Sequence, residues 1–207
     1  MTRLVLVRHG ETTWHAENRY AGVTDVPLTP RGLEQAAQLA DWARTADLAA
    51  VWSSDLTRAR LTAEPCAEAA GLAPRIDERL RELDFGRAEG LTRAEMRTRF
   101  PEALQAFHDD PVNGHLPGGE DPAAAAARFT ACLGDIVDGH PGDRVLVVAH
   151  TTAIRLALCT LLGLPLSAYR RLFPAVRNCA LTEVRVEGGE VALLAFNTPI
   201  EALELPQ

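Results

Sequence analysis

The stretch LVLVRHGETTWHAEN, residues 4–18, contains the first predicted secondary-structure element and the polar residues that follow it. Its first four residues are apolar, and so short a run before a polar segment predicts a buried β-strand. Arg8 and His9 stand side by side where that strand ends, and Gly10 follows them. In open parallel sheets the chemistry gathers at the carboxyl ends of the strands. The placement of Arg8 and His9 therefore indicates a functional edge of a sheet.

The same alternation of short apolar runs and longer amphipathic stretches continues along the chain. LVLV precedes the helical pattern TPRGLEQAAQLADWAR, AAVWSS precedes SDLTRARLTAEPCAEAAG, and RVLVVA precedes TTAIRLALCTLLG. This order predicts an α/β fold, a three-layer sandwich with a mainly parallel central sheet and helices on both faces. ALTEVRV and EVALLAF, joined through Gly188 and Gly189, predict a C-terminal hairpin.

Local signals mark some of the boundaries. Thr29 before Pro30 predicts a helix start, and Gly71 predicts a helix end. Between residues 83 and 122 the pattern weakens into a short helix-like TRAEMRTRF and a segment rich in proline and glycine. We expect this excursion to cover the active face, where functional loops lie in such folds. The whole chain, 1–207, suits a single domain.

Composition narrows the classes of function. The chain is 47% hydrophobic and 24% charged, which is typical of an ordinary globular protein. A formal net charge of −7 argues against nucleic acid or an anionic membrane as partner. The sequence contains no signal-peptide core and no spanning segment, so we expect a cytoplasmic protein. The widely spaced cysteines predict buried thiols rather than a zinc cage or disulfides; they are Cys66, Cys132, Cys159 and Cys179.

Three of the predicted strands run into polar groups of one kind. These are Arg8 and His9 after the first strand, Arg58 in the helix after the second, and His150 after the third. Guanidinium groups match phosphate oxygens, and imidazoles donate hydrogen bonds or attack phosphorus. Helix N-termini expected at Ser54 and Thr151 add backbone N–H groups that favour an anion. The convergence predicts a phosphate-binding cradle, and neither G-x-x-x-x-G-K-[ST] nor G-x-G-x-x-G is present.

A metal centre is the competing use of the same region. His9, Glu11, His15 and His150 are all metal-ligand types. The guanidinium group of Arg8 at the same place repels a cation, so we expect no metal and no other cofactor.

Five motifs in this order resemble the histidine phosphatase superfamily, whose fold is phosphoglycerate mutase-like. They are RHGET (8–12), DVPLTPRG (25–32), SSDLTRARLTA (53–63), RELDFGRAEG (81–90) and AHTTAIR (149–155). The resemblance spans nearly the whole chain.

The resemblance implies a role for each matching residue. His9 is the nucleophile that becomes phosphorylated, and Glu82 is the acid/base. Arg8 and Arg58 bind the phosphoryl group together with His150, which also belongs to the catalytic set. Physical chemistry independently favours this role for His9, because histidine attacks only as neutral imidazole and adjacent guanidinium groups disfavour its protonated form. Without the motif, Glu82 would be interpreted as a surface carboxylate paired with a neighbouring arginine.

Two positions depart from the family pattern. Many relatives carry a phosphate-contacting asparagine where this chain has His15. His15 is therefore a candidate hydrogen-bond donor to phosphate, and the alternative is that its side chain points away from the site. Relatives often have glycine after the second histidine, where this chain has Thr151. The resemblance also makes Thr151, Gly22 and Val23 candidate substrate contacts.

The sequence favours one activity within the family. By the resemblance, mutases hold a second phosphate with basic residues of a longer insertion, whereas the insertion EALQAFHDDPVNGHLPGGED is short and acidic or neutral. We therefore expect a metal-independent phosphatase that releases inorganic phosphate from a small phosphorylated metabolite. Sugar phosphates, phosphoglycerate derivatives and nucleoside or ribazole phosphates are the candidate substrates. A mutase-type phosphotransferase and a non-catalytic phosphate-ester binder are the alternatives, and a homodimer is compatible with the sequence.

Overall fold

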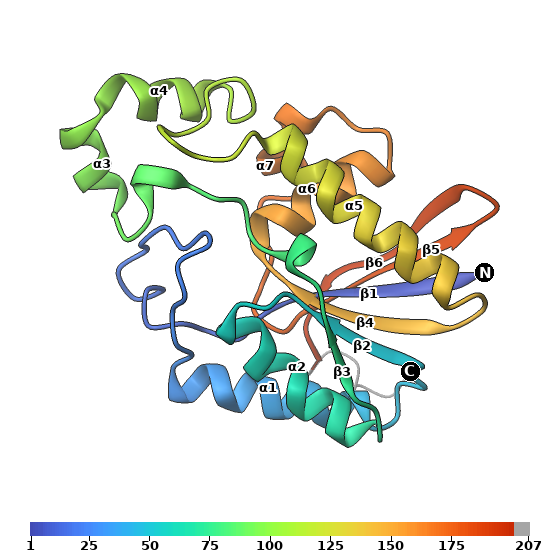
Figure 1. Ribbon diagram of the computed structural model, residues 1–207. Helices are drawn as coiled ribbons and strands as arrows, with labels where there is room; N and C mark the ends of the chain where they lie inside the picture. The colour runs from blue at the N-terminus through green and yellow to red at the C-terminus, as the bar shows by residue number, and fades with distance from the viewer. Residues whose placement is uncertain (201–207) are drawn as a thin grey trace.

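The computed structural model describes residues 1–200, which form a six-stranded sheet in the order β3-β2-β4-β1-β5-β6 (Figure 1). The strands are β1 (Thr2–Arg8), β2 (Ala50–Ser53), β3 (Pro74–Ile76), β4 (Arg144–Ala149), β5 (Leu181–Glu187) and β6 (Glu190–Thr198). β1 to β4 are mutually parallel, β5 runs antiparallel to β1, and β5 and β6 form the hairpin. The predicted mainly parallel sheet and C-terminal hairpin are confirmed. Residues 201–207 of the predicted domain lie outside the described part.

The register between β1 and β4 brings their ends together. Arg8 pairs with Ala149, and the backbone N–H of His9 donates to the Ala149 carbonyl at 3.1 Å. His9 and His150 therefore leave the sheet side by side. The apolar run before Arg8 is fully buried, with every residue from Leu4 to Val7 at 0% exposure. Such burial on both faces is what a central parallel strand requires.

Helices cover both faces of the sheet, as predicted (Figure 1). α1 (Pro30–Ala43) and α2 (Thr57–Ala69) pack with Val5 and Val7, whereas α5 (Pro122–Gly139) and α6 (Thr151–Leu161) pack with Leu4 and Leu6. The alternation along β1 follows from the twofold period of a strand. The expected helix start is also present, because the Thr29 side chain accepts a hydrogen bond from the Gly32 backbone N–H at 3.0 Å.

The loop after β1 lies directly against the first turn of α1. A Cβ at Gly10 would lie 2.4 Å from the Gly32 carbonyl oxygen, and one at Gly32 would lie 2.1 Å from the Glu11 carbonyl oxygen. Both positions therefore need glycine for close backbone approach. This contact fixes the segment that carries His9.

The excursion over residues 83–122 lies beyond the carboxyl ends of the strands (Figure 1). It contains a 3₁₀ turn (Gly86–Ala88), α3 (Arg93–Arg99) and α4 (Pro101–Asp109). α3 is the predicted short helix, and Thr92 and Glu95 close it with a capping box. α4 was not predicted. A further 3₁₀ turn (Leu166–Ala168) leads into α7 (Tyr169–Leu172) beside it.

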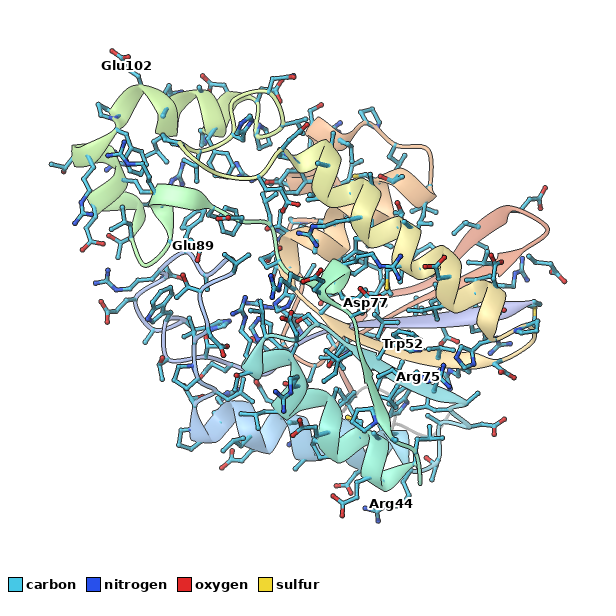
Figure 2. All side chains as sticks on the ribbon, viewed as in Figure 1. Arg44, Trp52, Arg75, Asp77, Glu89 and Glu102 are labelled. Carbon is cyan, nitrogen blue, oxygen red and sulfur yellow. The ribbon has the colours of Figure 1, made fainter. Side chains whose placement is uncertain are left out.

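The start of α2 and the presence of β3 differ from the sequence expectation. α2 begins at Thr57 with Leu56 as its N-cap, so the helix N-terminus expected at Ser54 is wrong. The short edge strand β3 was not predicted; its residues are exposed, and its Arg75 guanidinium lies 5.5 Å from the centre of the Trp52 ring on β2 (Figure 2). The expected buried thiols are confirmed, since all four cysteines are buried and free. Within residues 1–200, no helix is both long and apolar enough to cross a membrane.

Candidate active site

His9 presents one ring nitrogen to the site and anchors the other. Its Nδ1 lies 2.7 Å from the carbonyl oxygen of Gly10. A carbonyl only accepts hydrogen bonds, so Nδ1 carries the proton of the neutral ring and Nε2 carries the free lone pair. The Asn178 side chain donates to the His9 carbonyl at 2.7 Å and fixes the backbone as well. The geometry therefore orients His9 as an Nε2 nucleophile.

The surroundings of His9 keep it neutral. Burial lowers its pKa well below the ordinary value, and the guanidinium groups of Arg58 and Arg8 lower it further. The hydrogen bond to Gly10 acts in the opposite direction but is a smaller effect. With an exposure of only 5%, His9 is available as the free base at neutral pH.

Arg8 and Arg58 are held by main-chain carbonyls. Arg8 Nη1 donates to Val176 at 2.9 Å, while Arg58 donates from Nη1 to Thr24 at 2.9 Å and from Nη2 to Gly22 at 2.6 Å. Burial lowers the pKa of Arg8 to about 10, so the group stays charged at neutral pH. Both cations are thus fixed in position without a salt bridge to a carboxylate within residues 1–200.

His150 lies beside His9, with ring centroids 5.1 Å apart. Its Nε2 is 2.7 Å from the hydroxyl oxygen of Ser54, which explains the position of Ser54 better than a helix start does. Burial, followed by the charge of Arg58, lowers the pKa of His150 well below its ordinary value. Among residues 1–200, three buried nitrogens of this cluster have no hydrogen-bond partner: Arg8 Nε, Arg58 Nε and His150 Nδ1. The two guanidinium nitrogens are donors that suit phosphoryl oxygens, and His150 Nδ1 is a third donor in the tautomer in which Ser54 donates to Nε2.

Glu82 is buried and faces the N-terminus of α6. Its Oε2 accepts from the backbone N–H of Thr152 at 2.9 Å, and its Oε1 accepts from Ala153 at 2.8 Å and from Leu83 at 2.9 Å. The carboxylate therefore occupies the anion position that the start of α6 was expected to offer. The ion-pair interpretation of Glu82 is wrong, because Arg79 pairs with Asp77 and Asp135, and Arg81 pairs with Asp55.

His15 turns toward the site rather than away from it. Its Nδ1 accepts from the Thr12 backbone N–H at 3.0 Å, and its Nε2 contacts Arg8 Nη2. Burial and the neighbouring Arg8 lower the pKa of His15 to about 4, so the ring is neutral at neutral pH. This position adds a third imidazole to the edge of the sheet, 6.2 Å from His9 between ring centroids.

A cavity of about 590 Å³ opens over these groups. Its lining includes Arg8, His9, His15, Glu82 and Thr151, whereas Arg58 and His150 are fully buried beneath it. The size is typical of small-molecule sites. A cavity of about 700 Å³ lies on the other side of Arg8 and also touches Thr151, but neither His9 nor Glu82 lines it. The smaller cavity is therefore the one in which a reaction at His9 takes place.

Gly22 and Val23 do not line either of these cavities. Gly22 supports Arg58 through its carbonyl, and the Val23 backbone N–H donates to the Glu89 side chain at 2.9 Å. Glu89 also accepts from the Thr24 backbone N–H at 2.7 Å, which ties the excursion to this loop (Figure 2). The structure thus assigns Gly22 and Val23 a supporting position.

Four arginines surround the cavity mouth, and the sequence reasoning singled out none of them except Arg93, a possible contact for a second anionic group. Arg19, Arg93, Arg155 and Arg170 all line it. Arg155 follows Thr151 by four residues on α6 and so lies on the same helix face, a spacing that the sequence does contain. Of the excursion arginines only Arg93 lines the cavity, and aromatic rings of Tyr20, Phe85 and Tyr169 complete the wall. In the described residues, no group of three or more His, Cys, Asp or Glu side chains is arranged to hold a metal ion.

Comparison with known proteins relates the chain to one superfamily. A family model described as the histidine phosphatase superfamily (branch 1) matches residues 4–199. A Citrobacter koseri protein named probable phosphoglycerate mutase GpmB is 40% identical over 189 residues, which is 89% of this chain and 85% of that protein.

Solved structures show the same similarity. Bacillus stearothermophilus YhfR is 32% identical with a TM-score of 0.90, covering 96% of this chain and 98% of its own. A mycobacterial glucosyl-3-phosphoglycerate phosphatase in complex with VO3 is 30% identical with a TM-score of 0.87, covering 95% and 99%. The α-ribazole phosphatase from Shigella flexneri is 26% identical with a TM-score of 0.85, covering 95% and 96%.

Proposed function

Because this chain belongs to the histidine phosphatase superfamily, branch 1, we propose that it is a metal-independent phosphomonoesterase acting through a phosphohistidine at His9. The proposal rests on one observation, that His9 is a neutral and oriented imidazole at the cavity. Its Nδ1 is bound to the Gly10 carbonyl, its pKa is lowered by burial and by two guanidinium groups, and its ring lines a cavity together with Glu82. A neutral imidazole with a free Nε2 beside fixed cations is an activated nucleophile for phosphorus.

In the first step, Nε2 of His9 attacks phosphorus and the bond from phosphorus to the ester oxygen breaks. Glu82, protonated, gives its proton to the departing alkoxide. Oε2 of Glu82 accepts only one backbone hydrogen bond, from Thr152, whereas Oε1 accepts two. Oε2 therefore keeps a lone pair to carry that proton. Arg8 and Arg58 stabilise the charge on the equatorial oxygens.

In the second step, water replaces the alcohol in the site. Glu82 takes a proton from the water molecule, whose oxygen attacks the phosphohistidine and breaks the bond from phosphorus to nitrogen. Inorganic phosphate leaves, Glu82 is protonated again, and His9 regains its lone pair. The cycle needs no cofactor.

His15 serves as an additional phosphate donor in this proposal. The Thr12 backbone N–H donates to its Nδ1, which leaves Nε2 to carry the one proton of the neutral ring. Nε2 then faces Arg8 Nη2, which is also a donor. A phosphoryl oxygen that accepts from both groups satisfies both donors.

Phosphatase activity is favoured over mutase activity by the composition of the excursion. The short excursion contributes a single arginine, Arg93, to the lining. The solved neighbours named above include two phosphatases, whereas the curated relative is named a probable mutase. We place the chain with the hydrolases because a mutase must retain the phosphoenzyme and hold a second phosphate.

The substrate in this proposal is a small phosphorylated metabolite whose alcohol carries negative charge. Arg93, Arg155 and Arg170 line the cavity without a carboxylate partner among residues 1–200. In a chain of net charge −7, this local excess of cations favours an anionic alcohol such as a glycerate derivative.

The test is hydrolysis of p-nitrophenyl phosphate and of sugar, glycerate and nucleoside phosphates in EDTA. We expect turnover by the wild type and a loss of at least about 10³-fold in His9→Ala. Undiminished turnover by His9→Ala would contradict the proposal. Mutase activity on 3-phosphoglycerate that equals or exceeds its hydrolysis would instead favour the phosphotransferase alternative.

A further inference from the structure

One arginine of α5 contacts the main chain that carries Glu82. Arg128 Nη1 donates to the carbonyl oxygens of Arg79 and Arg81, both at 2.8 Å. Its Nη2 donates to the carbonyl of Glu82 itself at 2.9 Å. These contacts join residues 46 to 49 positions apart in the chain. The segment that presents Glu82 is therefore held from the side of α5.

The same guanidinium forms a two-pronged ion pair with Glu120. Arg128 Nε donates to Glu120 Oε1 at 2.7 Å, and Nη2 donates to Oε2 at 2.8 Å. All five N–H donors of the guanidinium are thus used, each on a different bond. Lysine has three donors on a single nitrogen and has no equivalent of this arrangement.

Glu120 forms hydrogen bonds with the main chain that follows Glu82. Its Oε2 accepts from the Asp84 backbone N–H at 3.3 Å, and its own backbone N–H donates to the Asp84 carbonyl at 2.9 Å. Capping of α5 does not explain Glu120, because Asp121 caps the helix by accepting from Ala123 at 2.8 Å. Arg128 holds residues before Glu82, and Glu120 holds the residue two positions after it.

The pair is also shielded from water. The side chains of Arg128 and Glu120 are each 22% exposed, well below an ordinary surface ion pair such as Arg60–Glu64 at 46% and 41%. Neither residue lines the catalytic cavity. The hydrogen bonds of the pair reach the reaction through the backbone at Glu82, and the charge of Arg128 also contributes to the lowered pKa of His150.

We infer that Arg128 and Glu120 are a positioning pair that sets the carboxyl group of Glu82 for proton transfer to the leaving alcohol. The inference rests on the proposed function. The main chain at Glu82 fixes the direction of its Cα–Cβ bond, and the N-terminus of α6 receives the carboxylate at the other end. Releasing one end lets the carboxyl group move away from the ester oxygen, and small misplacements of this kind are costly in catalysis.

The experiment compares two esters of similar size and charge, p-nitrophenyl phosphate and phenyl phosphate. p-Nitrophenolate leaves readily without a proton, whereas phenolate is a poorer leaving group and depends more on the general acid. In Arg128→Lys and Glu120→Gln we expect kcat/KM for phenyl phosphate to fall about tenfold more than kcat/KM for p-nitrophenyl phosphate. A purely structural loss would lower both values equally.

Asp135→Asn is the matched control. Asp135 lies on α5 like Arg128 and forms an exposed ion pair with Arg79 at 2.7 Å, but it makes no contact with the Glu82 backbone. We expect this variant to keep the wild-type ratio of the two kcat/KM values. Thermal unfolding of each variant identifies any that fails to fold. If Arg128→Lys does not fold, Glu120→Gln, which keeps the side-chain shape, serves as the test of the inference.

A second comparison uses the Glu82→Gln background. If Arg128 acts through Glu82, adding Arg128→Lys to Glu82→Gln changes the ratio of the two esters no further. An additional tenfold change there, or an unchanged ratio in the folded single variants, would overturn the inference. If Glu82→Gln changes the ratio of the two kcat/KM values but Arg128→Lys and Glu120→Gln do not, the proposed function stands and only the inference about the positioning pair fails. If the wild type hydrolyses neither ester, both fail.

Discussion

The floor and the wall of the catalytic cavity are built differently. The floor consists of Arg8 and His9 at the end of β1, together with Arg58 on α2 and His150 after β4, which are buried beneath them. His9 is 5% exposed, and both Arg58 and His150 are 0% exposed. The wall consists of Arg19, Arg93, Arg155 and Arg170 with the neighbouring aromatic rings, and it is supplied by loops, by the excursion and by α6 and α7. A fixed floor suits the phosphoryl group common to all esters, whereas a more exposed wall suits selection among alcohols.

The largest effect should come from the floor. Arg58→Lys removes the forked donor that Gly22 and Thr24 hold in place. We expect kcat/KM to fall about 100-fold for every ester, whatever its alcohol, because the lost forked donor acts on the phosphoryl group and the lysine ammonium cannot replace its geometry. Arg60→Lys, which alters an exposed arginine on the same helix, is the control. Losses confined to one class of ester would place Arg58 in the wall instead.

The floor should also carry the acid sensitivity of folding. A histidine whose folded pKa is lowered stays neutral in the native state while the unfolded chain takes up a proton. The free energy of unfolding is therefore fully retained above about pH 6.5 and decreases as the pH falls below that value. Burial lowers the pKa of both His9 and His150 in this way.

Denaturant titrations between pH 5 and 6.5 measure this slope. We expect His9→Gln to reduce it by up to about 1.4 kcal/mol per pH unit, since one proton no longer distinguishes the two states. Arg155→Gln, a change in the wall, should keep the wild-type slope. An identical slope in wild type and His9→Gln would show that His9 is not held neutral by its surroundings.

The wall should discriminate by the charge of the alcohol. Arg155→Gln and Arg93→Gln should each lower kcat/KM for 3-phosphoglycerate about tenfold, the value of one hydrogen bond to a charged group. For glycerol 3-phosphate, which lacks the carboxylate, the change should stay within about twofold. Arg97→Gln, on α3 but outside the cavity, is the matched control. Equal losses on the two esters would mean that these arginines act on the phosphoryl group.

The smallest effect is expected at the histidines of the excursion. His108 is exposed on α4 beside Asp109, and His115 is exposed in the following loop. Neither lines the cavity. His108→Ala and His115→Ala should each change kcat/KM for any ester by less than about twofold, as expected for surface substitutions. A larger change would extend the wall toward α4.

The central sheet could be predicted because its signals are local. The apolar run before Arg8 and the run before His150 each identify a strand, and parallel pairing then brings both ends to one edge. The start of α2 was mispredicted at Ser54, since a serine suits an N-cap as well as it suits its actual position against His150. α4 was not predicted, because the prolines and glycines that follow it closely are typical of a loop.

The site was only partly predictable, because only some of its residues carry a local sequence signal. The motifs identified the residues of the floor, and the four-residue spacing from Thr151 to Arg155 was a usable signal for the wall. By contrast, the contacts of Arg128 join positions 46 to 49 residues apart and follow no periodicity. Such contacts depend on how α5 packs over the Glu82 segment, which a single sequence does not display.

Trapping the phosphoenzyme tests the central claim most directly. The wild type, mixed rapidly with p-nitrophenyl phosphate and quenched in alkali, should give a peptide containing a phosphohistidine at His9. ³¹P NMR of the denatured protein should place the phosphoryl group on Nε2, because Nδ1 donates to the Gly10 carbonyl. A phosphoryl group on Nδ1 or on His150, or hydrolysis with no phosphoenzyme at any time, would contradict the account.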